Sequence, residues 1–540
     1  MRRTFGSALL LLLGLMPLLA AEGQPAGANA PPSLNADSAW TLSTDNGATW
    51  SAGPFVVPGG KAATCMVRAV FTVPNPQACA FWELAHRFAP TQLKNCKVNE
   101  QAVAMPLPGM RYRSIPGIPA KALNAGQNTV TLTLAVDNRQ PRGAADQPRP
   151  DVSLDVPAER ATLAGQTLAF KTGPTLGAFS NEYFSVTCRT TVPAPAKLFV
   201  AFAGGANPEA ANAAPAEVAA SPDGFIHRFK VKLPQGTSGF KYYLEASLGD
   251  ARAVTKTAEV RIPKWVWSKN ADEVVRLVMA GDCRSRPEEW SQVAAAMLRE
   301  KPDLVVFSGD MLDCGLNDWE WDEHFFGPAS VRELLATIPF YAVQGNHEES
   351  APLFNELFFV PGEDGRANYW SQRFGSAEVI GIKLMWTADW ERTILKWLKN
   401  TLSASDASFI FLVEHFPAWS SGGQGKVDEK TGESRQWSCR TARSDLIPLM
   451  AKHKATALIV GHEHGYERSE TPQGITQIIS AGAGAPQAPK SKDAQRQNPH
   501  STKFVMALNY CLFEIKGEDC TLTAKTPDEK VLDTRSWKKR

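Results

Sequence analysis

Two histidines separated by a single residue, His462 and His464, follow an apolar run that ends at Val460. In extended backbone, side chains two positions apart face the same side, so both imidazoles can enter one cleft. This spacing does not suit a single helical pair, and it favours two ligands that serve two neighbouring metal ions. The whole chain has nine histidines, so a pair directly after a predicted buried strand indicates a binding site. A hydrogen-bonded loop pair is the alternative.

Ligand-type side chains also follow four earlier apolar runs of the sequence. Gly-Asp follows the first two runs, Gly-Asn-His-Glu follows the third, and Glu-His ends the fourth. A single Gly-Asp pair carries no information, but five such positions in chain order are too many for coincidence. The side chains that these positions offer are Asp282, Asp310, Asn346, His347, His415, His462 and His464.

The elements that must position these residues alternate between strands and helices from residue 274 onward. Buried strands are predicted over residues 274–280, 304–307, 340–343, 409–413 and 455–460, with a β-rich stretch over 369–386. Helices are predicted over residues 287–300, 389–402 and 444–453, and residues 318–338 are predicted to be mostly helical. This pattern predicts an α/β layered domain over residues 270–525, with the site in the loops at the strand ends.

The amino-terminal part of the chain has a β pattern instead. Residues 36–150 contain apolar runs at 63–73, 92–103 and 128–136, separated by Gly, Pro and Asn. The last run alternates Val or Leu on one face with Thr on the other, as a half-buried strand does. The order of the runs, with a turn at 123–128, resembles a galactose-binding-like jelly roll. The resemblance implies a carbohydrate-binding surface, and a packing or spacer role is the alternative.

A second β-rich region, residues 165–263, follows a proline- and arginine-rich stretch at 139–151 that is predicted to be a linker. An alanine-rich loop at 204–220 interrupts its strands, which are predicted at 183–192, 197–202, 225–233 and 240–248. The stretch Gly173 to Gly177, followed by a strand, resembles the fibronectin type III-like domain that precedes the catalytic domain in purple acid phosphatases. No residue of this region suggests catalysis.

The ligand-type positions resemble the calcineurin-like metallophosphoesterase superfamily, whose motifs run D-x-H, G-D, G-N-H-[DE], H and G-H-x-H. The G-H-x-H-x-Y-E-R form at residues 461–468 is most similar to purple acid phosphatases. The resemblance implies a β-sandwich flanked by helices, with Asp310 bridging two metal ions. By the same resemblance Asn346, His415 and His462 complete one metal site, and Asp282 and His464 hold the other. His347 would be a general acid or a phosphate-orienting residue.

Two metal ions of this kind explain the residue types. A pair of ions about 3.5–4 Å apart clamps a phosphoryl group and supplies a hydroxide nucleophile near neutral pH. Imidazole and carboxylate ligands suit iron, manganese or zinc. We therefore predict a binuclear-metal hydrolase that cleaves small phosphate monoesters through a metal-bridging hydroxide. A phosphodiesterase for nucleotides or glycerophosphodiesters is one alternative, and a non-catalytic glycan-binding protein with a decayed phosphoesterase domain is another.

Two residues depart from the family pattern. Arg284 stands where the D-x-H motif has its histidine, and a guanidinium cannot be a metal ligand. Asp313 stands three residues after the bridging aspartate, where purple acid phosphatases have the tyrosine that binds iron and gives them their colour. Asp313 is therefore a candidate substitute ligand. Arg284 either pairs with Asp313 or Asp310, or binds a substrate phosphate.

The amino-terminal residues suggest that the protein is exported. Residues 1–21 read as a signal peptide, with Arg2 and Arg3 before an apolar core and small residues at the cleavage region. Residues 22–35 are predicted to be a disordered leader. We expect a periplasmic or secreted protein without a membrane span, exported by either the general or the twin-arginine route. The formal net charge of +2 argues against a nucleic acid partner.

The nine cysteines show no disulfide framework. Cys283 and Cys314 lie close to predicted ligands, and they form either a disulfide or two buried thiols.

Overall fold

A computed structural model describes the chain from Trp40 to Arg540 with several internal gaps. The described residues are 40–52, 56–57, 64–86, 91–107, 109–136, 152–153, 162–204, 212–213, 217–220, 224–268, 273–348, 351–358, 369–384, 390–422, 434, 436–494 and 497–540. The predicted signal peptide, the leader and the linker at 139–151 lie outside them. None of the described helices combines the length and the apolar character that crossing a bilayer requires.

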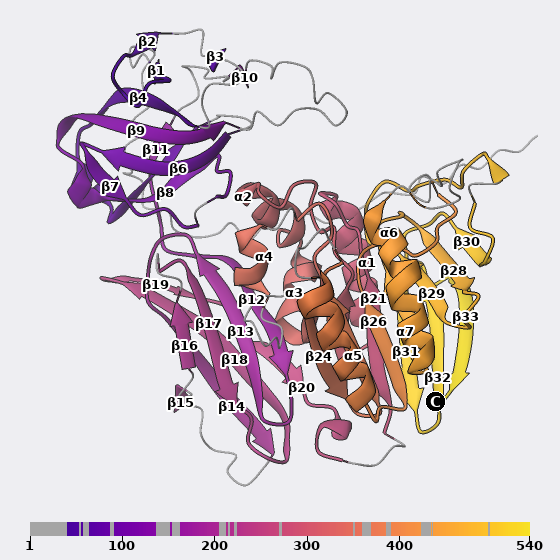
Figure 1. The fold of residues 1–540 in the computed structure, drawn as a ribbon. Coiled ribbons are helices and arrows are strands. Elements are labelled where there is room, and N and C mark those ends of the chain that lie inside the picture. Colours follow the sequence, from indigo (N-terminus) through magenta and orange to yellow (C-terminus); the bar gives the residue numbers. More distant parts are fainter. Residues whose placement is uncertain are drawn as a thin grey trace, which may run out of the picture.

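The first unit is formed by two main antiparallel sheets (Figure 1). One has the order β2-β1-β4-β9-β6-β7, the other the order β11-β5-β8, and β3 pairs with β10. Their bounds are β1 Thr41–Ser43, β2 Ser51–Ala52, β3 Val56–Val57, β4 Thr64–Val73, β5 Phe81–Ala85, β6 Thr91–Val98, β7 Gln101–Val103, β8 Ser114–Pro119, β9 Gly126–Val136, β10 Val152–Ser153 and β11 Thr162–Gly165.

The predicted alternation along β9 is confirmed, because Val130, Leu132, Leu134 and Val136 are all buried. The pairing of β11 with β5 carries this unit past residue 150, where its predicted range ends. Two antiparallel sheets around an apolar core agree with an all-β domain, and the jelly-roll type stays a prediction.

The second unit also has two antiparallel sheets, and they enclose a core of their own. One sheet has the order β12-β13-β17-β16, and β15-β14-β18-β19 with β20 beside β18 forms the other. The predicted alanine-rich loop includes the short strands β15 and β16. The bounds are β12 Phe170–Phe179, β13 Tyr183–Thr190, β14 Ala196–Gly204, β15 Asn212–Ala213, β16 Glu217–Ala220, β17 Ile226–Lys232, β18 Thr237–Leu248, β19 Ala251–Val254 and β20 Ala258–Arg261. The fibronectin type III-like assignment stays a prediction.

The third unit is the predicted α/β layered domain, built on two mixed sheets. Their orders are β23-β22-β21-β31-β32-β33 and β24-β25-β26-β27-β29-β28-β30. The strands are β21 Val275–Ala280, β22 Leu304–Phe307, β23 Phe340–Ala342, β24 Tyr369–Phe374, β25 Ala377–Ile382, β26 Phe409–Val413, β27 Ala457–Val460, β28 Tyr466–Glu470, β29 Thr476–Ser480, β30 Ser501–Val505, β31 Tyr510–Lys516, β32 Asp519–Lys525 and β33 Val531–Lys538. Because β33 pairs with β32, the unit continues beyond residue 525.

Helices cover the outer faces of this sandwich. On the first sheet, Trp290 and Val293 of α1 (Pro287–Arg299) pack in the same apolar cluster as the strands. On the second sheet, Leu398 of α5 (Leu395–Ala404) and Met450 of α7 (Ile447–Lys452) do the same. The remaining helices are α2 Asp318–Glu320, α3 Ala329–Thr337, α4 Pro352–Leu357 and α6 Trp437–Thr441.

The helical stretch predicted at 318–338 is divided into pieces. A π-helical turn, η5 (Trp321–Phe325), lies between α2 and α3. Two further π-helical turns, η6 (Trp390–Ile394) and η8 (Ala442–Leu446), begin the predicted helices at 389–402 and 444–453. The large aromatic side chains Trp321 and Phe325 are fully buried, so tertiary packing sets the local winding here.

Candidate metal centre

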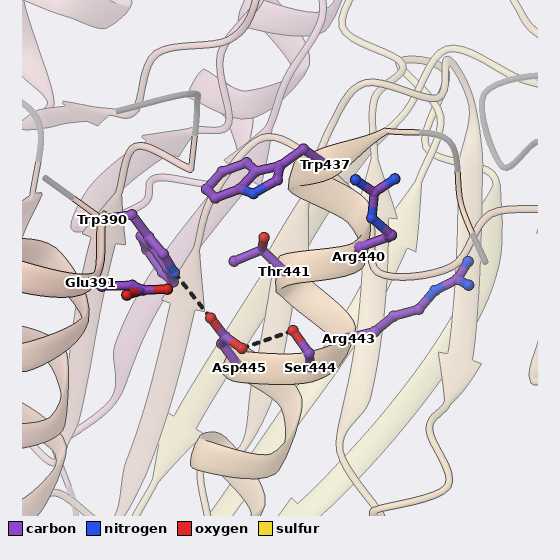
Figure 2. A pocket seen from close by; sticks show the side chains of 8 residues that line it. All are labelled: Trp390, Glu391, Trp437, Arg440, Thr441, Arg443, Ser444 and Asp445. Atoms are coloured by element: carbon purple, nitrogen blue, oxygen red, sulfur yellow. Dashed lines mark hydrogen bonds between the residues drawn. The ribbon is translucent and has the colours of Figure 1, made fainter. Parts of the chain in front are cut away.

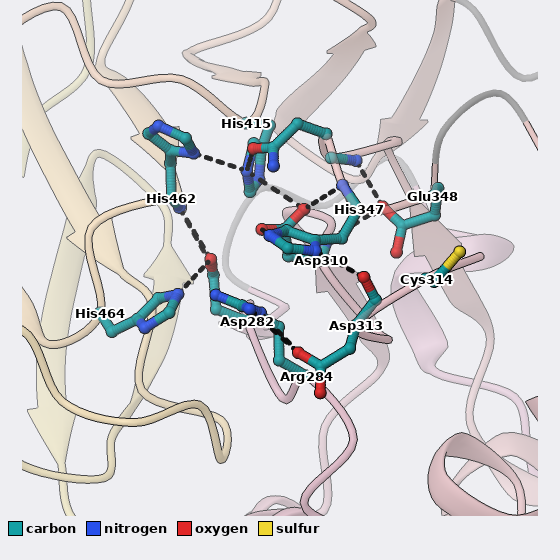
Figure 3. Close-up of polar contacts among 12 residues, drawn as sticks. Asp282, Arg284, Asp310, Asp313, Cys314, His347, Glu348, His415, His462 and His464 are labelled. Atoms are coloured by element: carbon teal, nitrogen blue, oxygen red, sulfur yellow. Dashed lines mark hydrogen bonds and ion pairs between the residues drawn. The ribbon is translucent and has the colours of Figure 1, made fainter. Parts of the chain in front are cut away.

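The seven ligand-type residues of the sequence come together in one site, and Figure 3 labels all of them except Asn346, which contacts His415. Strands β21, β22 and β23 are parallel, and so are β26 and β27 in the second sheet. Each of these strands ends immediately before a ligand-type residue or within four positions of one. Carboxyl ends of parallel strands meet at one edge, which brings residues far apart in the sequence into one site.

Glycines allow the strand-end loops to approach each other closely. A Cβ at Gly461 would lie 2.3 Å from Asp282 Oδ2, and one at Gly345 would lie 2.1 Å from Asp310 Oδ1. No side chain fits in such a gap, which explains why Gly precedes the ligand in these motifs. Asp282, Asp310 and His462 have left-handed backbone, with φ of 62°, 56° and 70°. Such strained conformations are concentrated at functional sites.

The first group of donors consists of Asp310, Asn346, His415 and His462. His415 is 1% exposed, and its Nδ1 lies 2.8 Å from the backbone oxygen of Ser308, to which it donates. Its Nε2 faces Asp310 Oδ1 at 3.3 Å, Asn346 Oδ1 at 3.1 Å and His462 Nδ1 at 3.2 Å. These atoms converge on one point, and their repulsion is offset by a bound metal ion or, without one, by a proton on His415 Nε2.

The second group consists of Asp282, Asp310 and His464. Asp282 is fully buried, and both of its carboxylate oxygens accept a hydrogen bond from the backbone N–H of His462. His464 Nδ1 donates to the backbone oxygen of Pro486 at 2.7 Å, which leaves its Nε2 for the site, 3.7 Å from Asp282 Oδ1. Asp310 belongs to both groups.

The pKa shifts show that the buried acidic and imidazole groups strongly affect one another's ionisation. Burial raises the pKa of Asp282 well above its ordinary value, and the like charge of Asp310 adds to the shift. Burial opposes ionisation of Asp310 as well, but the charge and hydrogen bond of His415 lower its pKa. Burial also opposes the charged form of His415, yet Asp310 raises the pKa of His415 to about 10. Burial and the neighbouring His415 lower the pKa of His462 to about 3.

The donor set fits a pair of metal ions. Imidazole nitrogens with their second nitrogen fixed by a backbone carbonyl are the usual arrangement for metal-binding histidines. Two buried carboxylates side by side, Asp282 and Asp310, need positive charge between or beside them. Within each group, all ligand atoms lie within 4.8 Å of one another, and the two groups share Asp310. The side chains therefore could hold two ions joined by one carboxylate.

His347 lies beside the two groups and is a member of neither. Its backbone N–H donates to Asp310 Oδ1 at 3.0 Å, and its Nδ1 donates to the backbone oxygen of Asp313 at 2.7 Å. Its Nε2 is 3.8 Å from Asp310 Oδ2, and the side chain is 25% exposed. This orientation leaves Nε2 at the open side of the site.

The two residues that depart from the family pattern contact each other. Arg284 Nη2 lies 2.9 Å and its Nε 3.1 Å from Asp313 Oδ1. The Asp313 carboxylate is 55% exposed and belongs to neither donor group. Asp313 is thus the ion-pair partner of Arg284 in this structure, which is the structural alternative that the sequence left open.

Three further side chains contact the site residues or their loops, and the sequence alone indicated no role for them. Glu348 is fully buried and accepts backbone N–H groups from Asp310, Met311 and Gly345 at 3.0, 2.7 and 2.6 Å. Its place in the G-N-H-[DE] motif was a signal. Gln436 lies 3.2 Å from His462 Nε2 and had no sequence signal. Glu320 also had no sequence signal, and its carboxylate connects the loop at Ser285 to the loop at Asp313.

Cys283 and Cys314 are free thiols, so the disulfide alternative is not formed. Burial raises the pKa of Cys283 well above its usual value.

A cleft of about 100 Å³ opens onto the donor groups, lined by Arg284, Asp310, Asn346, His347, His462, Glu463, His464 and Ala488. A separate hollow of about 470 Å³ lies over α6 and η8 (Figure 2). There Trp390 Nε1 donates to Asp445 at 3.0 Å, and Trp437 meets Trp390 edge to face. None of the donor-group residues lines this hollow.

Known proteins share this site region. The family model for calcineurin-like phosphoesterases matches residues 275–466. The chain is 30% identical over 270 residues to tartrate-resistant acid phosphatase type 5 of Homo sapiens, a match that covers 43% of this chain and 78% of the human protein. The same enzyme of Rattus norvegicus is 29% identical over 202 residues, covering 31% of this chain and about half of the rat protein (55%).

A solved structure supports the fold along most of the chain. It is a purple acid phosphatase from seeds of yellow lupin (Lupinus luteus), with a TM-score of 0.58 at 16% identity, covering 89% of this chain and 95% of that chain. The sandwich, the order of its motifs and the match to most of the human enzyme lead to one assignment. The chain belongs to the calcineurin-like phosphoesterase family, as an acid phosphatase-like metallophosphoesterase.

Proposed function

We propose that this protein is an exported enzyme that hydrolyses small phosphate monoesters with two metal ions bound in the centre. The convergence of acceptor atoms on one point around Asp310, His415 and His462 carries the proposal. When bound, the ions would polarise the phosphoryl group and supply a bridging hydroxide as the nucleophile. Asp310 would bridge the ions, Asn346, His415 and His462 would complete one site, and Asp282 and His464 the other.

His347 has the proposed role of a general acid or a phosphate-orienting donor. Because its Nδ1 donates to the Asp313 carbonyl, its orientation is fixed and Nε2 faces the cleft. A proton on Nε2 can be donated to the leaving oxygen of the ester, as general acid catalysis requires.

Arg284 has the proposed role of binding a substrate phosphate oxygen. It lines the cleft, and its partner Asp313 accepts both of its contacts through one oxygen, Oδ1. The remaining guanidinium N–H groups are available to an anion. In this reading the pair with Asp313 positions the guanidinium, so the structural and the functional role are compatible.

Phosphodiesters are the second class of substrate, and the small cleft favours the less bulky monoesters. Export rests on the signal-like residues 1–21, and carbohydrate binding by the first unit rests on the jelly-roll resemblance alone. Iron, manganese and zinc remain the candidate metals.

The test is turnover by the metal-loaded protein. We expect a preparation loaded with iron, manganese or zinc to hydrolyse an aryl phosphate and other monoesters faster than the matching diesters. The chelated protein is the control. A preparation that holds two ions and hydrolyses neither class would favour the non-catalytic glycan-binding alternative. Faster turnover of diesters would make phosphodiesters the main substrate class.

A further inference from the structure

Glu320 is a buried carboxylate that lies outside both donor groups and lines no part of the cleft. It is 6% exposed, and its Oε2 accepts three hydrogen bonds. The donors are the Ser285 hydroxyl at 2.7 Å, the Asp313 N–H at 3.0 Å and the Cys314 N–H at 3.1 Å. Its Oε1 accepts from Asn317 Nδ2 at 2.6 Å. One carboxylate therefore joins two loops that are separated in the sequence.

Each of these loops supplies one member of the Arg284–Asp313 pair. Ser285 directly follows Arg284, and both have left-handed backbone, with φ of 51° and 32°. The Ser285 hydroxyl also accepts the Asp313 N–H at 2.9 Å, so it lies between the carboxylate and the second loop. Left-handed backbone in two consecutive non-glycine residues persists only where neighbouring contacts hold it. Backbone bonds from Arg284 to Asp310 and from Arg286 to Cys283 hold this loop, and the Ser285–Glu320 contact adds the side-chain link to the second loop.

The second of these loops, residues 313–320, is also held on its other side by the first β unit. Arg111 N–H donates to the Leu316 carbonyl at 2.6 Å, and the Asp318 N–H donates to the Arg111 carbonyl at 2.9 Å. These two bonds accompany an isolated parallel bridge between Arg111 and Asn317. The segment 313–320 is thus held between the first unit and the metal centre.

We propose that Glu320 is a positioning residue that holds Arg284 and Asp313 in the geometry that binds the substrate phosphate. This inference deepens the proposed function and rests on it, because it needs Arg284 to contact an anion. Glu320 acts through the backbone of the two loops and makes no contact with substrate or metal. Its loss should therefore weaken phosphate binding and leave the metal ligands in place.

The test measures binding of inorganic phosphate to the metal-loaded protein by calorimetry, together with metal content and the kinetic constants. For Glu320→Gln we expect the dissociation constant of phosphate and KM to rise on the order of 10-fold, with kcat and metal content nearly unchanged. Glu323→Gln is the matched control, since Glu323 lies on the adjacent turn and, within the described part of the chain, its carboxylate forms an ion pair with Arg113 at 3.8 Å and none with the loops at the site. It should bind phosphate as the parent does.

A double variant separates positioning from general damage. In an Arg284→Ala background, Glu320→Gln should add little, because both changes remove the same contact. Additive effects, unchanged phosphate affinity of Glu320→Gln, or loss of metal would each overturn the proposal. If Glu320→Gln does not fold, Ser285→Ala removes one link between the loops, and it should weaken phosphate binding roughly 3-fold or more. Absence of any turnover by the parent would contradict the proposed function instead.

Discussion

The two halves of the centre differ in how firmly their polar side chains are held. In the first half, Asp310 and His415 are buried, and the His415 ring is fixed by the Ser308 carbonyl. On the other half, Arg284 and Asp313 replace two ligands of the family pattern, and the Asp313 carboxylate is 55% exposed. The first half thus brings together all four donors that the family pattern predicts for it, whereas the second has Asp282, Asp310 and His464 with an ion pair beside them.

This difference shows that the two departures from the family pattern belong together. An arginine alone beside a metal would place like charges together, and an isolated aspartate at position 313 would add a ligand. Paired at 2.9 Å, each neutralises the other. The second half shares the Asp310 carboxylate with the first and has a guanidinium at the cleft, which is the arrangement expected of a site that binds an anion beside a metal.

The largest expected effect would come from the residue that the two halves share. Replacing Asp310 by asparagine removes the carboxylate common to both donor groups. We expect metal content to fall and turnover to fall on the order of 10³-fold or more. Metal analysis and steady-state kinetics would check this. A variant that retains both ions and normal turnover would show that the halves do not share Asp310.

His347→Ala tests a residue that belongs to neither half. We expect turnover to fall by about 10²–10⁴-fold, since a proton donor is lost. Bound metal should be retained, because His347 contacts Asp310 and the Asp313 carbonyl and is in neither donor group. The control is His453→Ala, at the end of α7. Unchanged turnover in a folded variant would remove the general acid role.

The ion pair gives a smaller effect that sharpens the comparison. Arg284→Ala should raise KM about 10-fold, as expected for the loss of a charge-assisted contact to phosphate. Asp313→Asn should raise it only about 2–5-fold, because it weakens an exposed ion pair and leaves the guanidinium in place. Kinetics at low and high salt would check both. Equal effects on kcat alone would assign the pair to the metal and not to the substrate.

The smallest expected effect concerns the visible spectrum of the iron-loaded protein. Tyr466, the tyrosine of the G-H-x-H-x-Y-E-R motif, is buried, and its hydroxyl donates to Asp533 at 2.9 Å, away from the donor groups. With Asp313 at the family's tyrosine position, the iron-loaded protein should lack a tyrosinate charge-transfer band. A visible spectrum with parallel iron analysis would decide this, and a strong band would require a tyrosine ligand.

The sequence predicted best where local pattern and tertiary structure agree. Strands β22 and β26 have the bounds predicted from apolar runs that end at polar, ligand-bearing loops. The stretch predicted to be mostly helical at 318–338 is divided into helical pieces. Its buried Trp321 and Phe325 pack against aromatic rings that are distant in the sequence, namely Trp290, Phe307 and Phe358. Strand β33, with mostly exposed or half-buried positions, has no clear apolar pattern and was not predicted.

The candidate ligands could be read from motifs because metal binding restricts residue type and order. The groups that hold the ligand loops could not be read in this way. Glu320 and Gln436 act on partners that the fold brings from distant or differently oriented segments, and any acceptor in the right place would do. Pairing of Arg284 with Asp313 was one of several sequence alternatives, and only the loop geometry distinguishes it.

Arg189 of β13 lies 2% exposed between two carboxylates of the third unit, with Asp318 at 2.5 Å and Asp322 at 3.4 Å. Lys171 of β12 contacts the same pair at 3.2 and 2.6 Å. A buried charge that loses its partner costs about 3–5 kcal/mol. Separating the second β unit from the phosphoesterase sandwich would therefore leave these charges without their ion-pair partners. We expect these two units to unfold together on heating, with one calorimetric peak for both. Limited proteolysis during heating should then release neither unit as a folded fragment.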